Sequence, residues 1–185
     1  MLTKPKILIC LLFSGVSLGN SSSAMPDTLH NRGEEVLFII ERSRDADEIW
    51  YTTSKDAYGR LDPAMPVKVF WVRKSKENRK EQLTRIQNRF SYGIQPVSLD
   101  NFQGKGWKFK LAAYKDRIFE LRSVGEGKYK VFTQSGQREI EVIKLYVEFD
   151  GGDFPVPSIA FVLLTGRDMK TGEEIGEIIT GDIGR

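Results

Sequence analysis

Few residues in this 185-residue sequence could carry nucleophilic or acid–base catalysis. His30 is the only histidine and Cys10 is the only cysteine. The triads of serine and cysteine hydrolases need a base beside the nucleophile. His30 lies in a polar stretch without a periodic pattern, and no second metal ligand lies near it in the sequence. We therefore predict no catalytic residue of these types, no metal and no cofactor.

Aspartate and glutamate are the other residues whose spacing could support chemistry. The run Asp150-Gly151-Gly152-Asp153 places two carboxylates in one turn, and the stretch Asp45, Asp47 and Glu48 is also acidic. A calcium loop needs more oxygen ligands at fixed offsets than either stretch supplies. Solvated turns are therefore the expected role of both stretches. Carboxylates from different loops could still act as a pair in a glycosidase.

Five residues are candidates for binding rather than catalysis. Glu41 and Arg42 end an otherwise apolar run, and a strand-end ion pair would explain them. Alternatively they form the polar floor of a pocket at the end of a sheet, with Lys68 or Tyr92 as a neighbour. Trp50 is the fifth candidate. An aromatic residue at its position in a strand can stack on a sugar or pack in the core.

A basic run follows the predicted central strand. It comprises Lys74, Lys76, Arg79, Lys80, Arg85 and Arg89, against Glu77 and Glu81. Such a patch could bind anionic lipid head groups or acidic glycans. The alternative is the solvated face of an amphipathic helix.

Residues 1–24 have the pattern of a signal peptide. Lys4 and Lys6 precede an apolar run over residues 7–19, and the small residues Ser22 and Ala24 predict cleavage after Ala24. The apolar run is short for a membrane-spanning helix, although a retained anchor is the alternative. Cleavage removes Cys10 and two of the 28 basic residues, so the mature net charge is 26 − 25 = +1. We predict an exported protein, periplasmic or extracellular, with no nucleic-acid partner and no transmembrane helix in the mature chain.

The stretch Pro66–Arg73 is the predicted centre of the fold. Val67, Val69 and Trp71 occupy one face of a strand, and the other face becomes apolar halfway along. Strands with two apolar faces are covered on both sides of their sheet. This pattern favours a sandwich around Val69 and Trp71.

The rest of the chain predicts further strands and one helix. Strands are expected at 36–40, 49–53, 107–111, 118–124, 129–133, 139–149, 159–165 and 175–179. The apolar parity of residues 139–149 shifts between Val142 and Ile143, which indicates a bulge or a change of partner sheet. For the helix, Asn78 is the expected cap with Glu81, and Leu83, Ile86 and Phe90 share one face.

These elements define the predicted domain. Residues 25–35 are expected to form a flexible arm, and residues 36–181 a single all-β domain. We predict a mainly antiparallel β-sandwich of about eight or nine strands, with one α-helix inserted after the third strand. A closed β-barrel is the alternative.

Four stretches in this order resemble a known family. They are Phe38–Ser43 (FIIERS), Pro66–Trp71 (PVKVFW), Tyr92-Gly93, and Gly166–Glu173 (GRDMKTGE). Together they resemble DUF4833, an uncharacterised bacterial export family described as a domain of unknown function. The resemblance covers about Val36 to Ile179. It implies a single-domain exported protein and supplies no activity and no functional residue.

The sequence predicts a non-enzymatic exported domain that binds a protein partner, a glycan or a lipid. The binding surface would be one end of its sheet or the basic helix. The alternative is a glycan-acting hydrolase that uses carboxylates. Two or more carboxylates lining one concave pocket beside a tyrosine or arginine, at a spacing fit for catalysis, would favour the hydrolase, whereas carboxylates scattered on turns would favour binding.

Overall fold

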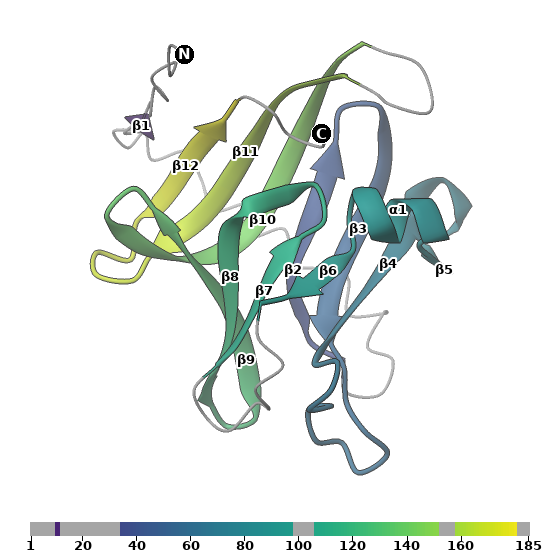
Figure 1. Cartoon of the computed structure of the whole chain (residues 1–185), viewed down its shortest axis with the longest axis vertical. Coiled ribbons are helices and arrows are strands. Elements are labelled where there is room, and N and C mark those ends of the chain that lie inside the picture. Colours follow the sequence, from purple (N-terminus) through teal and green to yellow (C-terminus); the bar gives the residue numbers. More distant parts are fainter. Residues whose placement is uncertain (1–9, 12–33, 98–105, 152–157, 181–185) are drawn as a thin grey trace.

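The structure is a computed structural model, and it describes residues 10–11, 34–97, 106–151 and 158–180. Its described part is built almost entirely of strands, which confirms the predicted all-β class (Figure 1). The strands are β1 Cys10–Leu11, β2 Val36–Arg42, β3 Asp45–Thr53, β4 Val67–Arg73, β5 Arg79–Gln82, β6 Ile94–Pro96, β7 Trp107–Leu111, β8 Tyr114–Gly125, β9 Lys128–Ser135, β10 Arg138–Gly151, β11 Ser158–Asp168 and β12 Glu174–Ile179. A 3-10 turn, Lys74–Lys76, follows β4, and the α-helix α1 spans Arg85–Phe90.

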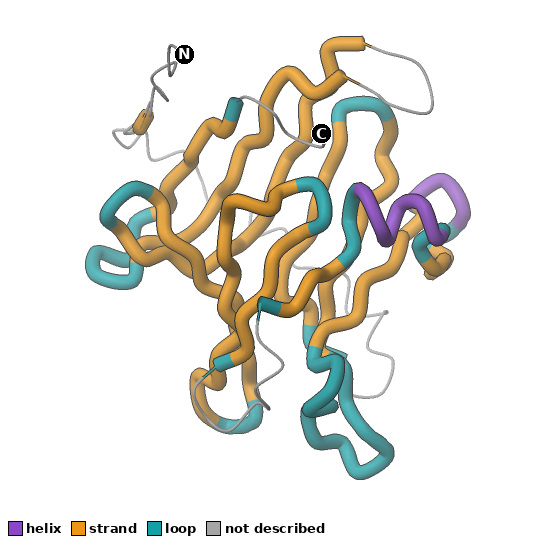
Figure 2. The backbone as a smooth tube through the Cα atoms, in the orientation of Figure 1, coloured by secondary structure: helices purple, strands orange, loops and turns teal. Residues whose placement is uncertain are grey.

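The strands form one strongly curled sheet that closes to a half-barrel (Figures 1 and 2). The order along its main path is β5-β4-β3-β2-β10-β9-β8-β7-β6, and β11 joins β10 to β12. The pairing of β2 with β10 is parallel, and the other strand pairs are antiparallel. The architecture therefore lies between the predicted sandwich and the alternative barrel.

The long strand β10 is the point at which the sheet branches. One of its edges is shared, because Arg138–Glu141 pairs with β9 and Lys144–Val147 pairs with β2. The register with β11, on the other edge, shifts between Val142 and Lys144. A bulge and a change of partner thus coincide at Ile143, where the parity of the apolar residues changes. This confirms the prediction, and the bend directs the two halves of the sheet toward each other.

The core lies on the concave side of this curl. Trp71 is 1% exposed and packs with Val67, and the partly buried Val69 packs on the same cluster. The ring of Phe38 stacks on Tyr51 at 4.2 Å and on Phe119 at 6.1 Å. Aromatic contacts therefore join the β2–β3 half to the β8 half.

The other face of β4 is also covered, as its sequence predicted. Phe70 and Val72 pack with Trp50 in a second, smaller cluster. The ammonium groups of Lys80 and Lys74 lie 4.7 Å and 5.7 Å from the rings of Phe70 and Trp50. The stems of long basic side chains can cover apolar surface in this way while their charges stay in water.

The predicted start of the helix is wrong. Residues 79–82 form β5 and pair with β4, because Glu77 and Asn78 adopt left-handed φ values of 53° and 60° and turn the chain back. The helix begins later, where the Thr84 hydroxyl accepts from the Gln87 backbone N–H and the Gln87 side chain accepts from the Thr84 N–H. This capping box has the predicted form but lies six residues further along.

The predicted leader and arm lie mostly outside the described residues. Of residues 1–24, the structure describes Cys10–Leu11, whose backbone pairs with Glu177 and Gly176 of β12. His30, Gly152 and Asp153 also lie outside the described residues. Among the residues it does describe, no helix has the length and apolar character needed to cross a membrane.

Candidate functional site

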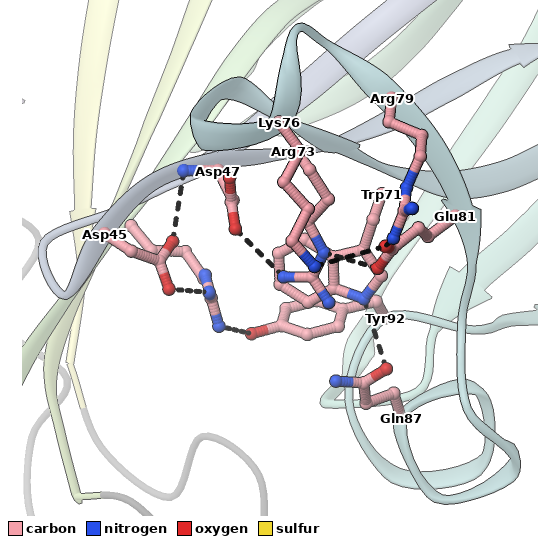
Figure 3. Close-up of polar contacts among 10 residues, drawn as sticks. Asp45, Asp47, Trp71, Arg73, Lys76, Arg79, Glu81, Gln87 and Tyr92 are labelled. Carbon is pink, nitrogen blue, oxygen red and sulfur yellow. Dashed lines mark hydrogen bonds and ion pairs between the residues drawn. The ribbon is translucent and has the colours of Figure 1, made fainter.

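Polar side chains gather around Trp71 where β2 and β4 end and β3 begins (Figure 3). We call this group the Trp71 cluster; its members are Arg42, Asp45, Asp47, Trp71, Arg73, Arg79, Glu81, Gln87 and Tyr92. They come from four adjacent strands, from α1 and from the segment that follows it.

The strand register explains why these residues meet. Arg42 pairs with Asp45 across the β2–β3 hairpin, and Trp71 lies opposite both Ile49 of β3 and Glu81 of β5. Side chains alternate between faces, so the face that carries Ile49 also carries Asp47 and Asp45. In the same way Arg73 lies on the face of Trp71. The core-facing side of the sheet therefore becomes polar at one end, formed by the last residues of β2 and β4 and the first residues of β3.

Arg42 is the best enclosed cation of the cluster. Its side chain is 14% exposed, and its guanidinium carbon lies 4.3 Å from the centre of the Trp71 ring. Nη1 donates to the Tyr92 hydroxyl at 3.3 Å, and Nη2 donates to Oδ2 of Asp45. Nε is buried and finds no hydrogen-bond partner among the described residues. A buried donor without an acceptor is uncommon in a folded protein.

Arg73 lies against the same indole ring from the neighbouring position on β4. Its guanidinium carbon is 4.4 Å from the centre of the Trp71 ring. Nη1 donates to Oδ2 of Asp47 at 2.9 Å, and Nε donates to Oε2 of Glu81 at 2.8 Å. The two carboxylates hold this guanidinium plane in place. Two guanidinium groups therefore lie against one indole ring, and the ring attracts each of them through a cation–π interaction.

The carboxylates that bind Arg73 stay ionised at neutral pH. Hydrogen bonds from Arg79 and Arg73 lower the pKa of Glu81 from 4.5 to about 2. Burial raises the pKa of Asp47, but the hydrogen bond and charge of Arg73 outweigh it, with help from the Ser75 and Lys74 backbone, so that the pKa falls. Neither group can supply a proton to a substrate at neutral pH, because both are already deprotonated.

The segment after α1 fixes the remaining side of the cluster. The Trp71 indole N–H donates to Oε1 of Gln87 at 3.1 Å, and the Tyr92 ring meets the Trp71 ring edge-on at 5.6 Å. The Tyr51 hydroxyl donates to the Tyr92 carbonyl at 2.6 Å. Gly93 allows this close return of the chain, since a Cβ there would lie 1.7 Å from the Asn88 carbonyl oxygen.

The structure brings together two of the five predicted site residues. Arg42 and Tyr92 are hydrogen-bonded within the cluster. Glu41 lies on the opposite face of β2, where it accepts from Lys144 at 3.0 Å. Lys68 is exposed and lies 3.5 Å from Glu34. Trp50 belongs to the second, smaller apolar cluster with Phe70 and Val72, and its indole N–H donates to Glu48 at 2.6 Å.

Several cluster residues were predicted in other roles. Trp71 was expected only in the core, Glu81 in a helix cap, and Asp45 and Asp47 in a solvated turn. Asp45 and Asp47 in fact open β3, and the turn before them is Ser43-Arg44. The signal that could have found them is parity: each lies two or four residues from a core position on the same strand.

A second buried ion pair lies elsewhere in the fold, between β8 and β12. The Arg117 guanidinium donates to both carboxylate oxygens of Glu177, at 2.8 Å and 2.5 Å, and lies 5.4 Å from the Tyr114 ring. Both charged side chains are largely buried, and each satisfies the other. Because the two side chains of this pair satisfy each other, we assign the pair a structural role. Across the ranges that the structure describes, no three acidic, histidine or cysteine side chains are grouped so that they could hold a metal ion.

Comparison with known proteins identifies the family of the chain. The model of the DUF4833 family, a domain of unknown function, matches residues 38–177. Neither the curated proteins nor the solved structures give a match. The matched range includes every residue of the Trp71 cluster and every strand from β3 to β11. The chain therefore belongs to the DUF4833 family, as the order of its four stretches predicted.

Proposed function

We propose that this protein is an exported, non-enzymatic domain that binds an acidic glycan through the Trp71 cluster. The observation that carries the proposal is the buried Nε of Arg42, for which the described residues supply no acceptor although Nη1 and Nη2 are both engaged. An oxygen of a bound saccharide would supply that acceptor. The signal-like pattern of residues 1–24 would bring the domain to the periplasm or the exterior, where such glycans occur.

The chemistry of the cluster favours a carboxylate-bearing ligand. A guanidinium presents a planar fork of donors that matches a carboxylate in two parallel hydrogen bonds. Asp45 holds Arg42 in the unliganded protein, but its side chain is 40% exposed. A ligand carboxylate could replace Asp45 on Arg42 and move this aspartate into water. The Tyr92 hydroxyl, already beside Arg42, could then bind a sugar hydroxyl.

Glycan hydrolysis with carboxylates is the second candidate. The favouring observation is that Asp45, Asp47 and Glu81 lie in one cluster with three arginines and a tyrosine. However, glycosidases need one carboxylic acid that is protonated at the working pH, with a raised pKa. The pKa values of Asp47 and Glu81 are shifted in the opposite direction. The electrostatics of the cluster thus support binding rather than acid catalysis.

Calorimetric titration with hexagalacturonate tests the proposal, and maltohexaose serves as the neutral probe of equal length. We expect binding of the acidic hexasaccharide and none of the neutral one. Arg42→Lys keeps the charge and removes the Nε–H and the fork, and it should weaken binding about tenfold or more. Arg60→Lys, in an exposed loop, is the matched control and should leave binding unchanged.

Two outcomes would reject the proposal. One is equal affinity of the Arg42→Lys variant and the unaltered protein, provided that both melt at the same temperature. The other is the appearance of new reducing ends when the protein is incubated with polygalacturonate, lost in Asp45→Asn or Asp47→Asn. That second result would establish the hydrolase instead.

A further inference from the structure

The structure divides the basic run of residues 74–89 into two groups. Lys74 lies 3.1 Å from Glu48, and Lys80 lies 3.2 Å from Glu34. Lys76 and Arg79 both pair with Glu81. Each of these four cations therefore has a carboxylate partner, in β3, in β5 or at Glu34, two residues before β2.

Arg85 and Arg89 form the other group. They lie one helical turn apart on α1 and are exposed. No carboxylate of the described part of the chain pairs with either of them. The Arg89 guanidinium carbon lies 5.1 Å from the Phe90 ring, and the residue as a whole is exposed to water. Within the described part of the chain, the cations of the run that have no carboxylate partner are therefore the two on α1.

The same helix exposes the two apolar residues that the sequence assigned to its buried face. Ile86 is 62% exposed and Phe90 is 56% exposed, and they lie four residues apart, on one side of α1. Ile86 and Phe90 therefore share one side of the helix, as predicted, but this apolar side is exposed to solvent and not buried. The helix is held from beneath by Gln87, through the Trp71 indole, and by the partly buried Leu83. Figure 2 shows α1 at the outside of the strand body, beside β4 and β5.

We propose that α1 docks this domain on an anionic phospholipid membrane, independently of the Trp71 cluster. Ile86 and Phe90 would enter the boundary between head groups and acyl chains, and Arg85 and Arg89 would contact lipid phosphates. Interfacial helices have this composition, with arginine or lysine beside phenylalanine and leucine or isoleucine. Juxtaposed basic residues add attraction to anionic lipids.

The size of the surface favours a membrane over a protein partner. A stable protein interface buries about 800 Å² on each partner, over about 20–30 residues. The exposed apolar surface of α1 is formed by two side chains on a helix of six residues. A bilayer needs no shape complementarity, so a small apolar wedge and two cations fit a membrane surface better than a protein interface.

Vesicle flotation tests the proposal with full-length protein. Vesicles of phosphatidylcholine alone are compared with vesicles that contain equal parts of phosphatidylcholine and phosphatidylglycerol. We expect stronger association with the anionic vesicles, reduced by 0.5 M salt because salt screens exposed charges (an ionic strength of about 1 M reduces the Debye length to about 3 Å). Arg85→Gln and Arg89→Gln should each weaken it about fivefold, and Ile86→Ser with Phe90→Ser about tenfold.

Matched controls carry the same changes elsewhere. Arg167→Gln with Lys115→Gln removes two exposed charges from β11 and β8, and Ile118→Ser with Val124→Ser removes two exposed apolar residues of β8. Both control pairs should bind anionic vesicles as the unaltered protein does. An equal loss of vesicle binding in the control pairs and in the α1 variants would overturn the proposal.

A local reporter separates α1 from the apolar leader, which could itself enter a bilayer. In a Cys10→Ser background, a nitrobenzoxadiazole label at Ile86→Cys should brighten and shift to the blue on anionic vesicles. The same label at Ile118→Cys should not change. A shift at both positions, or at neither, would contradict docking through α1, whatever the flotation result. Glycan titration does not use these variants, so either proposal can fail alone.

Discussion

The guanidinium of Arg42 lies 4.3 Å from the centre of the Trp71 ring, although β3 separates the strands that carry the two residues. The contact is possible because Trp71 is large enough to reach across Ile49 on the core side of the sheet. It places a charge at the boundary between the apolar core and water. The candidate site thus continues the core. A substitution that destabilises the core around Trp71 is therefore expected to alter the geometry of the site as well.

Trp71→Ala should lower the free energy of unfolding by about 3–5 kcal/mol, because a fully buried aromatic side chain is removed and leaves a cavity. Urea unfolding followed by circular dichroism measures the loss. The control is Tyr58→Ala, at an 84% exposed residue, which should change stability by less than about 0.5 kcal/mol. A Trp71→Ala variant as stable as the unaltered protein would place this residue outside the core.

The ion pairs of Glu81 should make stability depend on pH in the acid range. The folded-state pKa of this carboxyl is depressed from 4.5 to about 2, so its contribution is fully present above the unfolded pKa and disappears as pH falls toward 2. Glu81→Gln removes the titrating group. The urea midpoints of the two proteins should therefore differ at pH 7 and converge near pH 2. A constant difference across this range would contradict the assigned ion pairs.

The buried pair between Arg117 and Glu177 should behave differently from surface pairs. Glu177→Ala leaves a buried guanidinium without its partner and should cost about 3–5 kcal/mol of stability. Arg60→Ala breaks the ion pair of this exposed arginine with Asp56 and should cost no more than about 1 kcal/mol. Chemical denaturation of both variants gives the comparison. Similar small losses in the two variants would argue against a buried, mutually satisfied pair.

Export should leave a chain that begins at Met25. Intact-mass measurement of the protein recovered from outside the cytoplasm checks this directly. The expected mass corresponds to residues 25–185, without an added lipid, because Cys10 lies inside the apolar run and is removed with it. Retention of residues 1–24, or a mass increase from lipid at Cys10, would contradict the predicted cleavage.

The body of the fold could be predicted because strand patterns are local. The alternation around Trp71 fixed the two covered faces of β4, and the parity shift at Ile143 marked the point where β10 changes partners. The helix start could not be placed in this way. Asn78 and Glu81 satisfy the local rule for a cap, but pairing with β4 gives residues 79–82 a strand instead.

The candidate site was predicted only in part, and parity explains the difference. Arg42 and Tyr92 meet as expected. Glu41 could not join them, since adjacent residues of a strand point to opposite faces. Lys68 is excluded for the same reason, because Val67 and Val69 take the core side. That Asp47 and Glu81 both reach Arg73 depends on the order of β3, β4 and β5, which no local pattern specifies.

The most direct test of the glycan site observes the Arg42 Nε–H itself. Nitrogen-15 NMR of the arginine side chains, recorded during titration with hexagalacturonate, reports whether this donor gains an acceptor. We predict that the Arg42 Nε–H resonance moves downfield and exchanges more slowly with water, while that of Arg60 stays in place. An Arg42 resonance that is unchanged at saturating hexagalacturonate would contradict the proposed site.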